Sequence, residues 1–269
     1  MTRIACQQLA PHLLDLEANR LDTTAVIRDM VRRGADIIVL PELVTSGYVF
    51  ESREEAASVA INSQHPLFGD WAAELSRAPD RAPLVIGGFC EQGSDGLIYN
   101  SAAVVSPSGV LAVYRKTHLW DREKLFFEPG AEMPPVIDTE FGKVGVLVCY
   151  DLEFPEMTRP LALAGADLIA VPTNWPRGGR PQGEHPSEVV IAMATARINR
   201  VFVACCDRTG TERGQEWTAG TAIINEQGWI VAGGRGTSAI ADVELARARD
   251  KRLTEMADAF ADRRPELYA

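Results

Sequence analysis

Residues 34–42 read GADIIVLPE, and this stretch indicates the fold class. The glycine ends a helix predicted over residues 13–33, and the β-branched run after it is typical of a short buried strand. The same order of glycine, strand and proline returns in residues 165–172, GADLIAVP. This repeat fits either a common turn between a helix and a strand or a relationship between two halves of the chain. In both cases the pattern predicts one continuous layered α/β fold.

Outward from these two stretches, short apolar runs alternate with longer segments in which apolar residues recur at helical spacing. Further strands are expected at residues 4–9, 84–89, 101–105, 110–115, 144–148, 167–171, 202–206 and 221–224. Further helices are expected at residues 54–61, 68–77, 156–164 and 187–199, the last with Ser187 as its N-cap. Because no linker rich in Pro, Gly or Ser interrupts the chain, we expect one domain over residues 1–240. The charged segment 241–269 is expected to form a surface helix or an arm on a partner subunit.

The composition, with 46% apolar and 24% charged residues among 269, is that of a folded protein. A net charge of -10 and the lack of a basic stretch argue against nucleic acid as a partner. No apolar run approaches the roughly 20 residues of a membrane helix, and the start of the chain has no signal-peptide pattern. We therefore expect a cytoplasmic protein without membrane contact.

The cysteines, histidines and glycines indicate which bonds and cofactors to expect. The five cysteines are spread over strand-like runs, which favours reduced thiols over disulfides. The four histidines lack the spacing of metal ligands, and no phosphate-binding glycine loop is present. Neither a metal site nor a nucleotide cofactor is expected.

Three reactive side chains, Glu42, Lys116 and Cys149, each follow a predicted strand. In open α/β folds the chemistry gathers beyond the carboxyl ends of strands, so we expect these groups to meet. A thiol is mostly protonated at neutral pH and becomes a nucleophile when a base such as Glu42 takes its proton. Lys116, aided by the backbone N–H of Tyr150, would stabilise the negative charge that forms on an amide oxygen or a nitrile nitrogen.

Each of these three residues also has a structural interpretation. A cysteine at the end of a buried strand is commonly a small core residue. Glu42 would then be a charge at a helix start, and Lys116 a solvated strand end. A further alternative pairs the thiol with His118, which shares a strand face with Lys116.

Three stretches occur in an order that resembles the nitrilase superfamily of carbon-nitrogen hydrolases. They are LPELVTSGY (residues 40–48), YRKTHL (114–119) and CYDLEFPE (149–156). The similarity continues through FEPG (127–130), DRTG (207–210) and GTAII (220–224). The resemblance therefore covers the chain to about residue 235.

The resemblance implies a four-layer α-β-β-α sandwich that forms a homodimer or larger homo-oligomer. It also implies a triad of Glu42, Lys116 and Cys149 that works without a metal or organic cofactor. A second glutamate is implied near the lysine, and Glu123 holds this place, either to hydrogen-bond Lys116 or to position the substrate. Glu128 is the rival for this role, and a solvated loop charge is the structural alternative for Glu123.

Substrate contacts are expected from Tyr48, Asn174 and Trp175, which lie at or near the predicted strand exits. Trp175 would either wall off an apolar pocket or pack in the core. Superfamily members that act on keto-acid amides often carry an arginine where this chain has Glu153. If Glu153 faces the pocket, it would repel an anionic substrate and favour a neutral or amine-bearing one. Residues 177–183 are expected to form a mobile loop that acts as a lid.

Together these features predict a thiol hydrolase that cleaves a small linear amide to an acid and ammonia through a thioester. The runner-up is an N-carbamoyl amine or amino acid amidohydrolase, which would also release carbon dioxide, and nitrile hydrolysis ranks third. Outside enzymes, the alternative is an inactive sandwich that only binds a partner.

Overall fold

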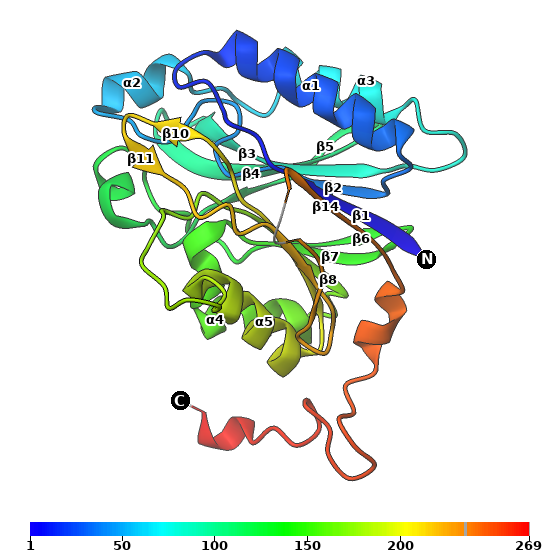
Figure 1. Cartoon of the computed structure of the whole chain (residues 1–269). Coiled ribbons are helices and arrows are strands. Elements are labelled where there is room, and N and C mark those ends of the chain that lie inside the picture. Colours follow the sequence, from blue (N-terminus) through cyan, green and yellow to red (C-terminus); the bar gives the residue numbers. More distant parts are fainter. Residues whose placement is uncertain (234–235, 269) are drawn as a thin grey trace.

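The computed structural model describes residues 1–233 and 236–268, and two six-stranded β-sheets form its centre. The sheets lie face to face, with helices α1 and α3 over one and α4 and α5 over the other (Figure 1). This arrangement confirms the predicted four-layer α-β-β-α sandwich.

The two sheets have the strand orders β14-β1-β2-β3-β4-β5 and β13-β12-β9-β8-β7-β6. The first consists of β1 (Thr2–Gln7), β2 (Ile37–Val39), β3 (Leu84–Gln92), β4 (Ile98–Ser106), β5 (Gly109–Arg115) and β14 (Ser238–Val243). The second consists of β6 (Val136–Thr139), β7 (Gly142–Val146), β8 (Leu168–Pro172), β9 (Phe202–Cys206), β12 (Ala222–Ile224) and β13 (Ile230–Gly233). A separate hairpin pairs β10 (Thr211–Glu212) with β11 (Gln215–Glu216).

The α-helices are α1 (Leu16–Arg32), α2 (Arg53–Ser58), α3 (Pro66–Leu75), α4 (Pro155–Leu163) and α5 (Ser187–Asn199). Short 3-10 helices are η1 (Asp121–Leu125), η2 (Cys149–Glu153), η3 (Leu245–Arg249) and η4 (Pro265–Leu267). Within residues 1–233 and 236–268, no helix is both long and apolar enough to cross a membrane.

Alternating residues of β2 show how the layers are held together. Ile37 and Val39 pack into the core between the two sheets, whereas Ile38 packs into the core beneath α1 and α3. This is the period of two of a β-strand, and both faces are apolar because both are covered. Burial of these apolar faces is the main favourable contribution to folding.

The predicted helices are present; four of them start one to three residues from the predicted position, and the fifth, α5, starts as predicted but with a different N-cap. α1 begins at Leu16 rather than at residue 13, because the Asp15 side chain accepts a hydrogen bond from the N–H of Ala18 and caps the helix. The prediction of Ser187 as an N-cap is wrong. Ser187 is the first helical residue of α5 after Pro186, and its hydroxyl donates to the Glu188 carboxylate.

Five strands, β6, β10, β11, β13 and β14, do not correspond to any predicted strand. β14 pairs antiparallel with β1, with Thr2 opposite Val243. Residue 240, where we expect the domain to end, therefore lies within a strand of the first sheet. Beyond β14, up to residue 268, the chain has only the 3-10 helices η3 and η4 in place of a surface helix.

A close backbone approach at Gly88 holds the segment that follows β2. Gly88 lies on β3, donates to the carbonyl of Pro41 at 3.0 Å and accepts from the N–H of Val44 at 3.0 Å. A Cβ at this position would lie 2.5 Å from the Cα of Glu42 and 2.3 Å from the nitrogen of Leu43. Glycine is therefore required for this turn to lie against β3.

We expect Gly88→Ala to lower the free energy of unfolding by about 1–3 kcal/mol, because backbone atoms must move to admit the methyl group. Gly69→Ala, at an exposed position of α3, is the matched control, since its Cβ would meet no heavy atom within 4 Å. In the control, the free energy of unfolding should rise by about 0.5–1 kcal/mol, because alanine is a better helix former than glycine. Urea unfolding measures both, and equal stabilities of the two variants would contradict this account.

Candidate active site

Lys116 follows β5, and its ammonium group is fully buried between two carboxylates. Its Nζ lies 2.6 Å from Oε1 of Glu42 and 2.7 Å from Oε1 of Glu123. Burial disfavours the charge, but the carboxylates of Glu123 and Glu42 outweigh it and hold the pKa of Lys116 well above its ordinary value. Lys116 is therefore a cation at neutral pH.

Glu42 follows β2, and its two carboxylate oxygens have different surroundings. Oε1 accepts hydrogen bonds from Lys116 and, at 2.7 Å, from Nδ2 of Asn100. Oε2 has no hydrogen-bond partner in the described part of the chain. Burial raises the pKa of Glu42 to about 7 against the opposing effect of Lys116, and the Glu123 carboxylate adds to the rise. A carboxylate with such a pKa and an unengaged oxygen is suited to accept a proton.

Cys149 is the first residue of η2 and has a φ of 48°. This left-handed conformation is uncommon for a residue with a side chain and turns the chain sharply after β7. The thiol is buried, and the charges of Glu42, Lys116 and Glu123 act on it together with the backbone N–H of Asn174. Burial and the Glu42 carboxylate raise the pKa of Cys149 well above its ordinary value, so the thiol needs a base to become a nucleophile.

Glu123 lies on η1 and links Lys116 to Tyr48. The Tyr48 hydroxyl donates to Oε1 of Glu123 at 2.5 Å, the same oxygen that receives the Lys116 ammonium. Glu123 is buried, so the alternative of a solvated loop charge is wrong. The rival Glu128 lies at the surface and pairs with Arg53 at 3.2 Å. We call the side chains of Glu42, Lys116, Glu123 and Cys149 the buried cluster.

A cavity of about 120 Å³ reaches this cluster at Glu123, which lines it together with Tyr48, whereas Glu42, Lys116 and Cys149 are not part of its lining. The wall is mainly aromatic and apolar, and the Tyr48 ring stands edge-on to the Trp217 ring at 5.4 Å. The other lining residues are Val49, Phe50, Trp120, Phe126, Pro176 and Gln215, with the charged Asp121 and Arg122 among them. A small, mostly apolar cavity next to a few polar groups is typical of a site for a small molecule.

Trp175 does not line this cavity. It is buried in the apolar core around the second sheet, and its ring packs against Gly220, where a Cβ would lie only 2.9 Å from the indole. The alternative of a packing tryptophan therefore holds, and Trp217 forms the aromatic wall that we expect of Trp175. The neighbouring Asn174 is at the cluster, since its Nδ2 donates to the carbonyl of Glu42 at 2.8 Å.

The Tyr150 and Glu153 side chains also lie outside the lining of the cavity beside Glu123. Tyr150 stands edge-on to Trp120, with a ring distance of 4.8 Å, and lines an open groove at the surface. Glu153 is exposed, and its pKa is raised by partial burial and then by the carboxylate of Glu188. Because Glu153 does not face this cavity, it does not provide the expected repulsion of anionic substrates there.

His118 is engaged away from the thiol. Its Nδ1 lies 2.9 Å from Oδ1 of Asp151, and its ring stacks on Phe154 at 3.6 Å. These contacts do not support the alternative of a pair with Cys149. Across residues 1–233 and 236–268, no three His, Cys, Asp or Glu side chains gather as metal ligands would.

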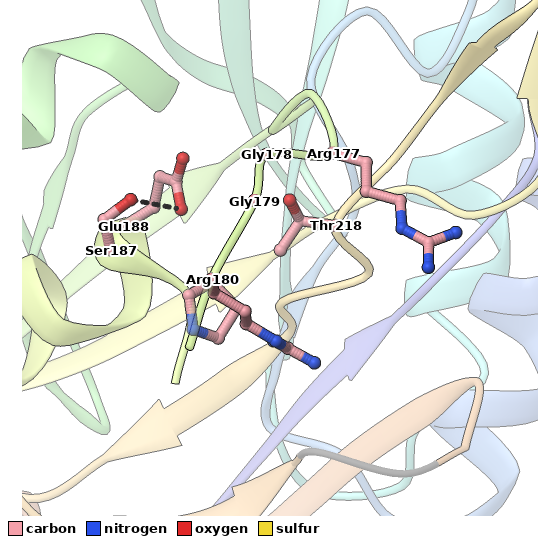
Figure 2. Close-up of a pocket in the computed structure, with 8 residues that line it drawn as sticks. Arg177, Gly178, Gly179, Arg180, Ser187, Glu188 and Thr218 are labelled. Atoms are coloured by element: carbon pink, nitrogen blue, oxygen red, sulfur yellow. Dashed lines mark hydrogen bonds between the residues drawn. The ribbon is translucent and has the colours of Figure 1, made fainter. Parts of the chain in front are cut away.

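Residues 177–180, from the segment expected to form a lid, line a second cavity of about 370 Å³ (Figure 2). In this view the Arg177 side chain points away from Ser187 and Glu188 on the opposite wall. Arg177 instead pairs with Glu216 at 2.9 Å. The lining of this cavity includes no member of the buried cluster.

Two buried polar residues that our sequence analysis did not select support the site. Asn100, within β4, donates to Glu42, and a polar residue inside an apolar strand is a signal that could have identified it. Glu212 accepts a hydrogen bond from the N–H of Tyr48 at 2.7 Å. Its partner is 164 positions away in the sequence, so no local pattern marks Glu212.

The chain matches one family over nearly its whole length. The family model described as carbon-nitrogen hydrolase matches residues 3–253. A protein named nitrilase from Pyrococcus abyssi is 35% identical over 272 residues, which cover 100% of this chain and 99% of that protein. An (R)-stereoselective amidase from Pseudomonas sp is 34% identical over 198 residues, which cover 73% of this chain and 68% of the amidase.

Solved structures of the amidase from Nesterenkonia sp. AN1 have the same fold. One has a TM-score of 0.79 and 25% identity, and the match covers 99% of this chain and 98% of the amidase. A variant of that amidase, with a TM-score of 0.79, 26% identity and coverage of 99% and 95%, shows covalent addition of the acetamide moiety of fluoroacetamide at its active site cysteine. The chain therefore belongs to the carbon-nitrogen hydrolase family of the nitrilase superfamily and is an enzyme that acts on C–N bonds.

Proposed function

We propose that the protein hydrolyses a small linear amide to a carboxylic acid and ammonia through a thioester on Cys149. The observation that supports this most is the Lys116 ammonium, held between Glu42 and Glu123 and beside the buried thiol. The cluster supplies a nucleophile, a base and a fixed positive charge, which are the groups that acyl transfer by a thiol needs. These side chains can perform every step without a cofactor.

In the first half of the reaction, the sulfur of Cys149 attacks the amide carbon while its proton moves to Oε2 of Glu42. The carbonyl oxygen becomes an oxyanion, which Lys116 and the backbone N–H of Tyr150 stabilise. When this intermediate collapses, the C–N bond breaks and Glu42 passes its proton to the leaving ammonia. The acyl group stays on the sulfur as a thioester.

In the second half, a water molecule attacks the thioester carbon and gives a proton to Glu42. The C–S bond breaks, the acid leaves, and Glu42 returns the proton to the sulfur of Cys149. One water is consumed, and one acid and one ammonia are released. Glu123 holds Lys116 in place through its hydrogen bonds and does not itself transfer a proton.

The substrate class is inferred from the cavity beside Glu123. Its volume of about 120 Å³ and its apolar aromatic wall favour a short, uncharged amide over a large or strongly ionic one. Tyr48 would contact the acyl part of the substrate, and Asn174 would hold the backbone of the base. Nitrile hydrolysis is the second candidate, because the relative from Pyrococcus abyssi is named a nitrilase.

Product analysis with a panel of short amides, N-carbamoyl amines and nitriles tests the substrate class. The proposal expects acid and ammonia in equal amounts from the amides, with no carbon dioxide. Preferential turnover of the carbamoyl compounds, with carbon dioxide, would instead indicate an N-carbamoyl amine hydrolase. Preferential turnover of nitriles would support the second candidate.

We expect Cys149→Ala and Cys149→Ser to abolish turnover while the unfolding midpoint stays close to that of the wild type. Intact-mass and peptide analysis after trapping with an amide should place the acyl group on the peptide that contains Cys149. Cys205 and Cys206 on β9 serve as internal controls, because both thiols are buried. Acyl labelling confined to these two residues would refute the assignment.

The base must be ionised to take the proton of the thiol, so kcat/KM should rise with pH through the pKa of Glu42, near 7. Glu42→Gln should lower kcat/KM by about 10²- to 10⁴-fold and remove this acid limb. Glu74→Gln is the matched control, because Glu74 is a buried carboxylate on α3 that pairs with Arg28 at 2.8 Å. An unchanged acid limb in Glu42→Gln would show that another group is the base.

A further inference from the structure

Asn100 contacts both the base and the chain segment that carries the ammonium. It lies on β4 with its side chain fully buried, and its Nδ2 donates to Oε1 of Glu42 at 2.7 Å. Its backbone carbonyl accepts a hydrogen bond from the N–H of Lys116 at 2.8 Å. One residue therefore sets the relative position of Glu42 and Lys116, which lie on opposite sides of it in the sequence.

The Asn100 amide and the Lys116 ammonium together engage one carboxylate oxygen of Glu42. Oε1 receives Nζ at 2.6 Å and Nδ2 at 2.7 Å, while Oε2 receives no hydrogen bond from any described residue. The carboxylate cannot rotate without breaking both of these bonds. The donors thus decide which oxygen remains available to the thiol.

The carbonyl oxygen of the Asn100 side chain, Oδ1, indicates that the residue is there for its Nδ2 donor. Its Oδ1 is buried and accepts no hydrogen bond from the described residues. An unpaired buried acceptor costs free energy, so the side chain would be a poor choice for packing alone. The arrangement is explained if the Nδ2 donor is needed at Glu42.

Several titratable groups share the electrostatic environment of Glu42. They are Lys116 after β5, Glu123 on η1, Cys149 on η2, Tyr48 after β2 and Asp207 after β9. Among them, Glu123 favours the protonated form of Glu42 and Lys116 favours the ionised form. The hydrogen bond from Asn100 also favours the ionised form, because it is made to the carboxylate.

We propose that Asn100 is a positioning residue, which fixes Oε2 of Glu42 as the proton acceptor and, through its bond to Oε1, favours the carboxylate over the protonated form. This inference rests on the proposed function, in which Glu42 is the base for Cys149. Asn100 acts through Glu42 and takes no part in bond making itself.

The test compares pH profiles of kcat/KM for the wild type, Asn100→Leu and Asn100→Asp. Leu has nearly the same size but no donor, so the acid limb should move up by about one pH unit. Near pH 7 this move lowers kcat about fivefold or more, while KM should change little. Asp has the same shape and adds a carboxylate next to Glu42. This negative charge raises the pKa of Glu42, so the acid limb of the Asp variant should also move to higher pH. The Asp variant carries the test if the Leu variant does not fold.

Ser101→Ala is the matched control. Ser101 is the next residue on β4, is equally buried, and donates its hydroxyl to Glu91 outside the buried cluster. This variant loses one buried hydrogen bond from the same strand and should keep the wild-type acid limb. The proposal on Asn100 is overturned if Asn100→Leu and Asn100→Asp lose activity without a move of the limb, or if they keep the wild-type profile.

A second readout separates this proposal from the proposed function. Alkylation of Cys149 by iodoacetamide, located by peptide mass analysis, follows proton removal from the thiol without an amide substrate. If no amide is hydrolysed but the pH dependence of alkylation moves up in Asn100→Leu, the function fails and the role of Asn100 stands. If Glu42→Gln removes the acid limb of amide hydrolysis and Asn100→Leu leaves it in place, the function stands and the role of Asn100 fails.

Discussion

The buried ammonium of Lys116 is the interaction on which the rest of the site depends. Removing one partner from a buried ion pair costs about 3–5 kcal/mol, because it leaves a charge without compensation. The fold must therefore bring Glu42, from the segment after β2, and Glu123, from η1, to the end of β5. The same requirement selects one arrangement of these segments and fixes positive charge beside the thiol of Cys149.

The chain adopts unusual backbone conformations at two of these strand exits. Leu43 has a φ of 46° and Cys149 a φ of 48°, and left-handed conformations of this kind cost about 1–3 kcal/mol each. The surrounding structure holds at least the first of them, because Gly88 lets the backbone approach β3 and Asn174 binds the carbonyl of Glu42. Strain that is fixed by its neighbours in this way is typical of preorganised active sites.

Local patterns predict a layered α/β fold and the meeting of Glu42, Lys116 and Cys149, whereas the four-layer arrangement and the place of Glu123 follow only from the resemblance to the nitrilase superfamily. An apolar run with a reactive residue after it marks a strand exit, as at Glu42. The pairing of β14 with β1 could not be predicted, since it joins the two ends of the chain. The wall of the cavity could not be predicted either, because the position of Trp175 after a strand favours it, and only packing shows that Trp217 lines the cavity instead.

If the Lys116 ammonium and the Glu42 carboxylate act as one unit with the Cys149 thiol, a double-mutant cycle on kcat will show it. Residues that act as a unit give strongly non-additive losses. Glu42→Gln combined with Lys116→Met should then lose little more activity than the more damaging single change. Losses that multiply would contradict it, because they would show that Glu42 and Lys116 act independently.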